Sequence, residues 1–101
     1  MITENDVLDK LRNIIDPELE VNIVDLGLIY NINIDPEGHR VDINMTLTAE
    51  GCPLSNVIKF EAEEALKGLE GVDEATVNIV WQPKWDQSMI KPEALKKLSR
   101  H

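Results

Sequence analysis

The chain has a single cysteine, Cys52, in the stretch LTAEGCPLSN (residues 47–56), between a strand-like and a helix-like pattern. At a helix N-terminus, free backbone amides and the positive end of the helix dipole stabilise an anion. A cysteine there can be held as a thiolate, which ligates metal or attacks an electrophile. Gly51 lets the backbone approach a ligand, and Pro53 fits the first turn of a helix. The alternative is a small apolar residue that caps the core, and the local sequence leaves both interpretations open.

Few other side chains in the sequence could complete a site around this thiol. The two histidines are His39, in or beside a predicted turn, and His101, the last residue. A nucleophilic Cys–His pair is therefore poorly supported. One cysteine also cannot supply a closed zinc site or the four thiolates of an iron–sulfur cluster. If Cys52 binds metal, the other ligands must come from carboxylates, a second chain, a client protein or a small thiol.

Carboxylates and hydroxyls in three other stretches are candidates to support the thiol. They are Asp16, Glu18, Asp25, Thr46 and Thr48. The two carboxylates around Pro17 also fit a solvated turn that ends a helix, and the third fits a side chain that caps a turn. The threonines also fit ordinary polar strand positions. Carboxylates close to Cys52 would oppose a thiolate unless a cation were present, so such an arrangement would itself point to metal.

Two tryptophans bracket the sequence QPK near the C-terminus. Trp81 continues an alternating apolar pattern and is expected in the core. Trp85 lies beyond Pro83 and outside any clear period. Because tryptophan is enriched among binding hot spots, an exposed Trp85 would be a partner contact.

The composition predicts one domain, residues 1–101, in a reducing compartment such as the cytoplasm. The chain has 19 acidic and 10 basic residues and a net charge of −9. This charge disfavours nucleic acid and anionic lipid as partners. No apolar run approaches the ~20 residues of a membrane span, and the N-terminus does not resemble a signal peptide. A single cysteine excludes an intrachain disulfide.

The apolar spacing predicts the elements in the order α-β-β-α-β-α. These are a helix over 3–15 with Thr3 as N-cap, strands over 28–34 and 41–47 joined by the turn DPEG, a helix from Pro53 with an apolar stripe through Leu69, a strand over 75–81, and a terminal helix with Pro92 near its start. Leu28, Tyr30 and Ile32 are expected on one strand face, and Val57 in the helix stripe. The pattern predicts a two-layer α+β sandwich with a small mixed or antiparallel sheet.

Four blocks in this order resemble the PaaD/SufT-like family of iron–sulfur cluster assembly factors, a former domain of unknown function. The blocks are DPEL (16–19), NIVDLGLIY (22–30), MTLTAEGCP (45–53) and QPKW (82–85). The resemblance covers nearly the whole chain. It implies an α/β domain of the iron–sulfur assembly type, with Cys52 as the functional thiol. The acidic DPE element of the family matches Asp16, Pro17 and Glu18, and the aspartate of its DLGL block matches Asp25. The threonines that precede the family's cysteine match Thr46 and Thr48.

The resemblance implies an accessory factor in iron–sulfur protein maturation rather than an enzyme. Cys52 would take part in transient transfer of a cluster or iron, with no tightly bound cofactor. Partners would be client apoproteins or cluster scaffolds, and a homodimer would help a one-cysteine chain. The alternative is a metal-free adaptor that docks a client or a multicomponent oxygenase of the phenylacetate-degradation type through Trp85, the terminal helix and the acidic face.

Overall fold

The computed structural model describes residues 2–17, 19–48 and 55–98. Its elements are α1 (Glu4–Leu11), β1 (Ile29–Ile34), β2 (Arg40–Met45), α2 (Ser55–Lys67), β3 (Glu74–Ile79), the 3₁₀ helix η1 (Gln87–Met89) and α3 (Pro92–Leu98). The predicted order of helices and strands is confirmed. Within these residues, no helix is long and apolar enough to cross a membrane.

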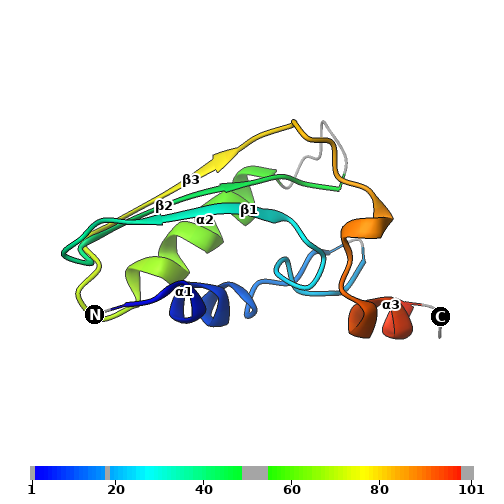
Figure 1. The fold of residues 1–101 in the computed structure, drawn as a ribbon, viewed down its shortest axis with the longest axis horizontal. Coiled ribbons are helices and arrows are strands. Elements are labelled where there is room, and N and C mark those ends of the chain that lie inside the picture. Colours follow the sequence, from blue (N-terminus) through cyan, green and yellow to red (C-terminus); the bar gives the residue numbers. More distant parts are fainter. Residues whose placement is uncertain (1, 18, 49–54, 99–101) are drawn as a thin grey trace.

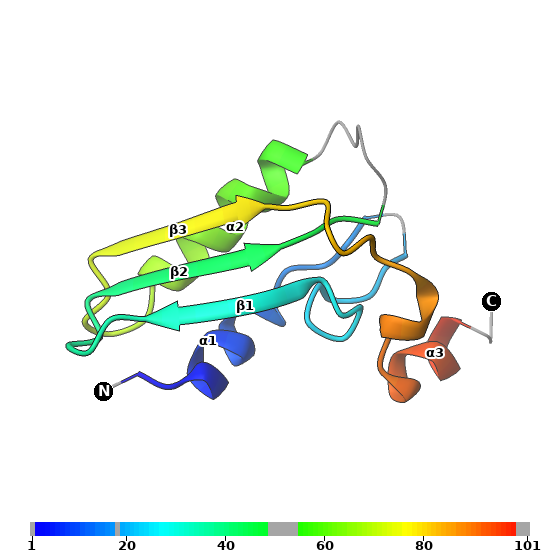
Figure 2. The same cartoon turned by 45° about the horizontal axis from the view of Figure 1, so that its top comes forward.

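The three strands form one mixed sheet in the order β1-β2-β3. β1 and β2 make the predicted antiparallel hairpin, whereas β2 and β3 run parallel. A parallel pair needs a crossover connection, and α2 supplies it. Because β1 runs against the other two strands, the start of β1 and the ends of β2 and β3 lie at the same end of the sheet (Figure 2).

The helices α1 and α2 lie side by side on one face of the sheet, and α3 lies beyond one end of it (Figures 1 and 2). The α2 helix packs against β3 and α1. The largest fully buried side chains form the core between the layers: Leu11, Ile23, Leu26, Leu28, Ile43, Met45 and Leu66. The two-layer α+β architecture predicted from the sequence is therefore confirmed.

The first helix begins where predicted but ends earlier. Thr3 is the N-cap, and its hydroxyl accepts from the Asp6 amide while the Asp6 carboxylate accepts from the Thr3 amide. The helix ends at Leu11, so the predicted extension to residue 15 is wrong. The Asn13 side chain donates to the carbonyl of Lys10, and Ile15 pairs with Asn22 in an isolated β-bridge. These contacts use the backbone groups that another helical turn would need.

A β-bulge near the start of β1 changes which side chains share a face. The register places Ile29 opposite Met45 and Asn31 opposite Asn44, so Tyr30 is the extra residue. The predicted alternation through Tyr30 is therefore wrong at this position. A bulge bends the strand and re-aims a side chain, and here it aims Tyr30 toward a later segment. The Tyr30 hydroxyl donates to the Pro83 carbonyl at 2.7 Å.

The second helix buries Ile58, Ala62 and Leu66 against the sheet. Val57, predicted in the same stripe, is 48% exposed, and this part of the prediction is wrong. On the side of the helix nearest β3, the Glu63 carboxylate accepts from the backbone amide of Val77 at 3.0 Å. This amide faces the open edge of the outer strand, and a charged side chain there discourages pairing with another strand.

The turn between β1 and β2 carries a histidine whose charge affects stability. The imidazole Nδ1 of His39 lies 3.0 Å from the Gly71 carbonyl, with the carboxylates of Glu37 and Asp73 each 3.8 Å from a ring nitrogen. The hydrogen bond to the Gly71 carbonyl is the largest cause that raises the pKa of His39 above its ordinary value of 6.5. Burial opposes this rise, and the charges of Asp73, Asp35 and Glu37 add to it. The protonated form therefore favours the folded state.

We expect the free energy of unfolding to be larger below the ordinary histidine pKa and to fall as pH rises through the raised value in the folded protein. The measurement is urea unfolding at about pH 5.5 and about pH 8.5. His39→Gln should remove this part of the pH dependence. An unchanged pH dependence in His39→Gln would show that other groups cause it.

Candidate functional site

A run of backbone hydrogen bonds extends the sheet beyond its named strands at the end where β2 and β3 finish. In each of these bonds a backbone amide donates to a backbone carbonyl, at 2.8–3.2 Å. The pairs, donor first, are Ile23 and Ile14, Leu28 and Ile23, Thr46 and Leu28, and Val80 and Met45. Segments from five parts of the chain are thereby held in a fixed lateral order. This run connects the segment before Asp16 with the segment that begins at Thr46.

Asp16 begins a tight turn at one side of this run. Its amide donates to the Val21 carbonyl, its carbonyl accepts from Glu20, and its carboxylate oxygen Oδ1 accepts from the Leu19 amide. The Asp16 side chain is buried, at 2% exposure, so the alternative of a solvated turn is wrong for this carboxylate. Glu20 takes a positive φ of 58° to close the turn. The burial of a carboxylate that organises its own loop is a property the sequence pattern did not reveal.

Thr46 follows β2 on the path toward Cys52. It is 1% exposed, and its hydroxyl is the one buried side-chain oxygen or nitrogen without a hydrogen-bond partner in the part of the chain that the structure describes. Burial of Tyr30 and the charge of Asp86 raise the pKa of this tyrosine, against the opposing effect of the Thr46 hydroxyl. A buried hydroxyl left unpaired costs about 1–3 kcal/mol, so it is a candidate group for a ligand.

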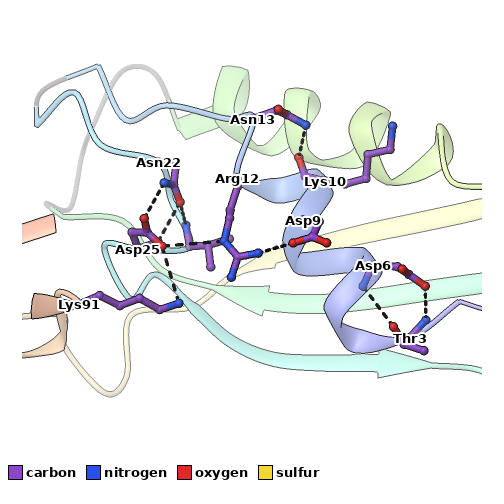
Figure 3. A network of polar contacts seen from close by, with 10 residues as sticks. Thr3, Asp6, Asp9, Lys10, Arg12, Asn13, Asn22, Asp25 and Lys91 are labelled. Carbon is purple, nitrogen blue, oxygen red and sulfur yellow. Dashed lines mark hydrogen bonds and ion pairs between the residues drawn. The ribbon is translucent and has the colours of Figure 1, made fainter. Parts of the chain in front are cut away.

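The predicted site residue Asp25 lies in a polar network between three segments (Figure 3). The Asn22 side chain caps the turn, accepting from the amides of Val24 and Asp25 and donating to the Asp25 carboxylate at 3.0 Å. The same carboxylate lies 3.9 Å from the Arg12 guanidinium and 3.7 Å from the Lys91 ammonium. Asp25 therefore connects the end of α1 with the start of α3, and its charge is balanced by cations of this chain.

Residues 82–91, here called the docked segment, pack against the turn that follows Asp25. The Trp85 indole donates to the Leu26 carbonyl at 2.6 Å, and the Lys91 amide donates to the Asp25 carbonyl at 2.8 Å. Gly27 lies so close to Met89 that a Cβ atom would fall 2.3 Å from the Met89 carbonyl oxygen. The sequence blocks DLGLIY and QPKW are separated by 51 residues in the sequence, and they form one packed unit beside the backbone run.

Trp85 is half-buried and packs against the core, so the premise of an exposed tryptophan is not met. Its indole bond to Leu26 gives it a structural role. Contact with a partner through Trp85 remains a prediction.

Replacing Trp85 by phenylalanine should lower the free energy of unfolding by about 1 kcal/mol, because the Leu26 carbonyl loses its donor while the aromatic packing largely remains. Urea unfolding measures the change. Trp81→Phe is the matched control, since no hydrogen bond from the Trp81 indole is found within the described residues. Equal stability of the two variants would contradict the structural role.

Four predicted site residues lie outside the described residues: Glu18, Gly51, Cys52 and Pro53. Of the others, Asp16 and Thr46 are buried at the end of the sheet where the backbone run lies, and the half-buried Thr48 follows two positions later. The structure does not place Asp25 with them, because its carboxylate faces Arg12 and Lys91. Sequence reasoning missed Tyr30 and Asn22, although the bulge and the short Asn-to-Asp spacing are local signals.

The described part of this site can supply the buried Asp16 carboxylate and the buried Thr46 hydroxyl, which precedes the cysteine by six positions in the sequence. No group of three or more His, Cys, Asp or Glu side chains that could hold a metal ion is found in residues 2–17, 19–48 and 55–98. The described residues therefore define a small mixed-sheet domain in which Thr48 and the start of α2 flank, in the sequence, the stretch that carries the single cysteine.

Comparison with known proteins identifies this class. Residues 4–79 match the family described as "Iron-sulfur cluster assembly protein". The chain is 43% identical to the "Fe-S protein maturation auxiliary factor YitW" of Bacillus subtilis, over 86% of this chain and 84% of that protein. It is 42% identical to the "Fe-S protein maturation auxiliary factor SufT" of Staphylococcus aureus, over 76% of this chain and 86% of that protein.

A solved structure of a "Domain of Unknown Function DUF59" from Bacillus anthracis superposes with a TM-score of 0.91 at 35% identity, covering 97% of this chain and 92% of that one. The chain belongs to the iron–sulfur cluster assembly protein family. The family resemblance and the fold predicted from the sequence are both confirmed.

Proposed function

We propose that this protein is an accessory factor in the maturation of iron–sulfur proteins, in which Cys52 takes part in transient transfer of a cluster or of iron. The observation that carries the proposal is the family match over residues 4–79, a range that contains the thiol and the buried Asp16 and Thr46. The names of the relatives, which are maturation auxiliary factors, support the same role.

The proposed role is non-catalytic. In this role the protein acts in the cytoplasm on client apoproteins or on a cluster scaffold. A cluster needs more thiolates than this chain has. Transfer therefore requires a cluster that is shared with a client, a second copy or a small thiol. The buried Asp16 and the unpaired Thr46 hydroxyl would support the segment that carries Cys52, with Glu18, Thr48, Gly51 and Pro53 beside them in the sequence.

The test is anaerobic reconstitution of the purified protein with iron and sulfide, beside Cys52→Ser, followed by absorption spectra and iron and sulfide counts. A chromophore that depends on Cys52 and carries stoichiometric iron is the expected result. Absence of binding in both forms would contradict a cluster carrier. It would favour the metal-free adaptor, whose Trp85→Ala variant should then lose co-purification with its partner.

A further inference from the structure

Two helices expose apolar side chains that the fold does not use. On α2, Val57 is 48% and Phe60 62% exposed, and on α3, Leu95 is 41% exposed. Val57 and Phe60 are three positions apart and therefore neighbours on one side of their helix. Glu61 and Glu64 follow on the same side, opposite the buried Ile58, Ala62 and Leu66. We call Val57, Phe60, Glu61 and Glu64 the α2 surface.

The α3 helix has the complementary character. Ile90 and Ala94 are buried, which seats the helix on the core, while Leu95 and Lys96 are exposed. The Lys91 amide and ammonium both contact Asp25, which fixes the start of the helix. We call Leu95 and Lys96 the α3 surface. One surface is apolar with two acidic neighbours, of which Glu64 lies 3.3 Å from the Lys67 ammonium of its own helix and Glu61 is exposed. The other surface is apolar with a basic neighbour.

Charge is also distributed unevenly along the chain, between the C-terminal residues that include α3 and the preceding residues that include α2. Residues 91–101 contain four basic residues and one acidic residue, whereas residues 1–90 contain six basic and eighteen acidic residues. Such an asymmetry favours contact of the basic end with an acidic surface. The overall charge of −9 opposes close approach of two copies, but this long-range repulsion is screened beyond about 8 Å at physiological salt.

We propose that the α3 surface of one copy docks on the α2 surface of a second copy, with Leu95 against Val57 and Phe60 and Lys96 facing the glutamates. A twofold axis would make this contact twice and close the assembly at a dimer. The second copy is thereby brought to the helix that follows Cys52 in the sequence. The contact itself needs no metal and does not depend on the proposed maturation role.

Crosslinking between two single-cysteine variants tests the pairing directly. In the Cys52→Ser background, Phe60→Cys and Leu95→Cys proteins are mixed and oxidised mildly. The disulfide between positions 60 and 95 should form at least about tenfold faster than one between positions 60 and 15, with Ile15→Cys as the exposed control. Equal rates for the two pairs would overturn the proposal.

Charge reversal tests the electrostatic part. Lys96→Glu on the Leu95→Cys copy should slow crosslinking, and Glu61→Lys on the Phe60→Cys copy should restore it. Lys84→Glu, which makes the same change in net charge outside both surfaces, should leave the rate unchanged. Equal slowing by Lys84→Glu and Lys96→Glu would show general repulsion instead.

Sedimentation velocity over a concentration series tests closure of the assembly. The unmodified chain should approach a dimer mass, and Phe60→Glu should remain a monomer while Ile15→Glu behaves as the unmodified chain. Masses beyond the dimer, or a monomer at every concentration, would overturn the twofold arrangement.

Discussion

Gly27→Ala should destabilise the protein by about 3 kcal/mol, a large share of the roughly 5–15 kcal/mol that holds a small domain folded. Two effects add at this position. The φ of Gly27 is +77°, a conformation that disfavours residues with a side chain. The new Cβ would also lie 2.3 Å from the carbonyl oxygen of Met89, which is backbone and cannot rotate away. Relief of this clash requires the docked segment to move off the turn after Asp25.

Gly71→Ala separates the two effects. Gly71 also has a positive φ, +89°, but an added Cβ there would meet no heavy atom within 4 Å. This control should lose only about 1 kcal/mol. Urea unfolding gives the two values, and the fluorescence of Trp85 should shift in Gly27→Ala as its environment opens. Similar losses in both variants would mean that the docked segment does not press on Gly27.

Cys52→Ser should reduce the activity of iron–sulfur enzymes in cells to the level found without the gene. Serine is close in size to cysteine, but its hydroxyl is neither a soft metal ligand nor ionised at neutral pH. If the thiol carries iron or a cluster, removal of the sulfur abolishes the transfer and leaves the client unloaded. The measurement is the activity of a cluster-dependent enzyme in a strain that carries only the variant.

The folded state of this variant must be checked in the same experiment. We expect equal urea midpoints for the Cys52→Ser and unmodified proteins, which assigns the loss to chemistry rather than to unfolding. Cys52→Ala extends the comparison to a side chain without any hydroxyl and should behave like serine. Normal enzyme activity with either substitution would exclude Cys52 from transfer.

The strand hairpin was predictable because its signals are local. Alternating apolar residues and the DPEG turn act within a few positions, and the structure forms the hairpin with Gly38 at a φ of +75°. The N-cap at Thr3 was predictable for the same reason. The end of α1 was not, because the groups that replace the next helical turn come from the Asn22 segment.

For the candidate site too, local features were predictable from the sequence, whereas contacts between distant segments were not. Residue types and spacing singled out Asp16, Thr46 and Asp25, but not their burial or their partners. The Asp25 carboxylate is held by Lys91, 66 positions later, and the indole bond of Trp85 reaches Leu26, 59 positions earlier. Such pairings depend on how the docked segment crosses back from the end of β3 to the start of β1. No sequence pattern within either block encodes this path.

The bonds from the docked segment to the turn after Asp25 have a consequence for protein synthesis. A chain that is still growing can form the hairpin and α2 early, since these contacts are near in sequence. The turn receives its donors from Trp85 and Lys91 only when those residues have been added. Docking of residues 82–91 on this turn is therefore among the last steps of folding. Interrupted translation leaves a fragment whose turn after Asp25 lacks the donors from Trp85 and Lys91.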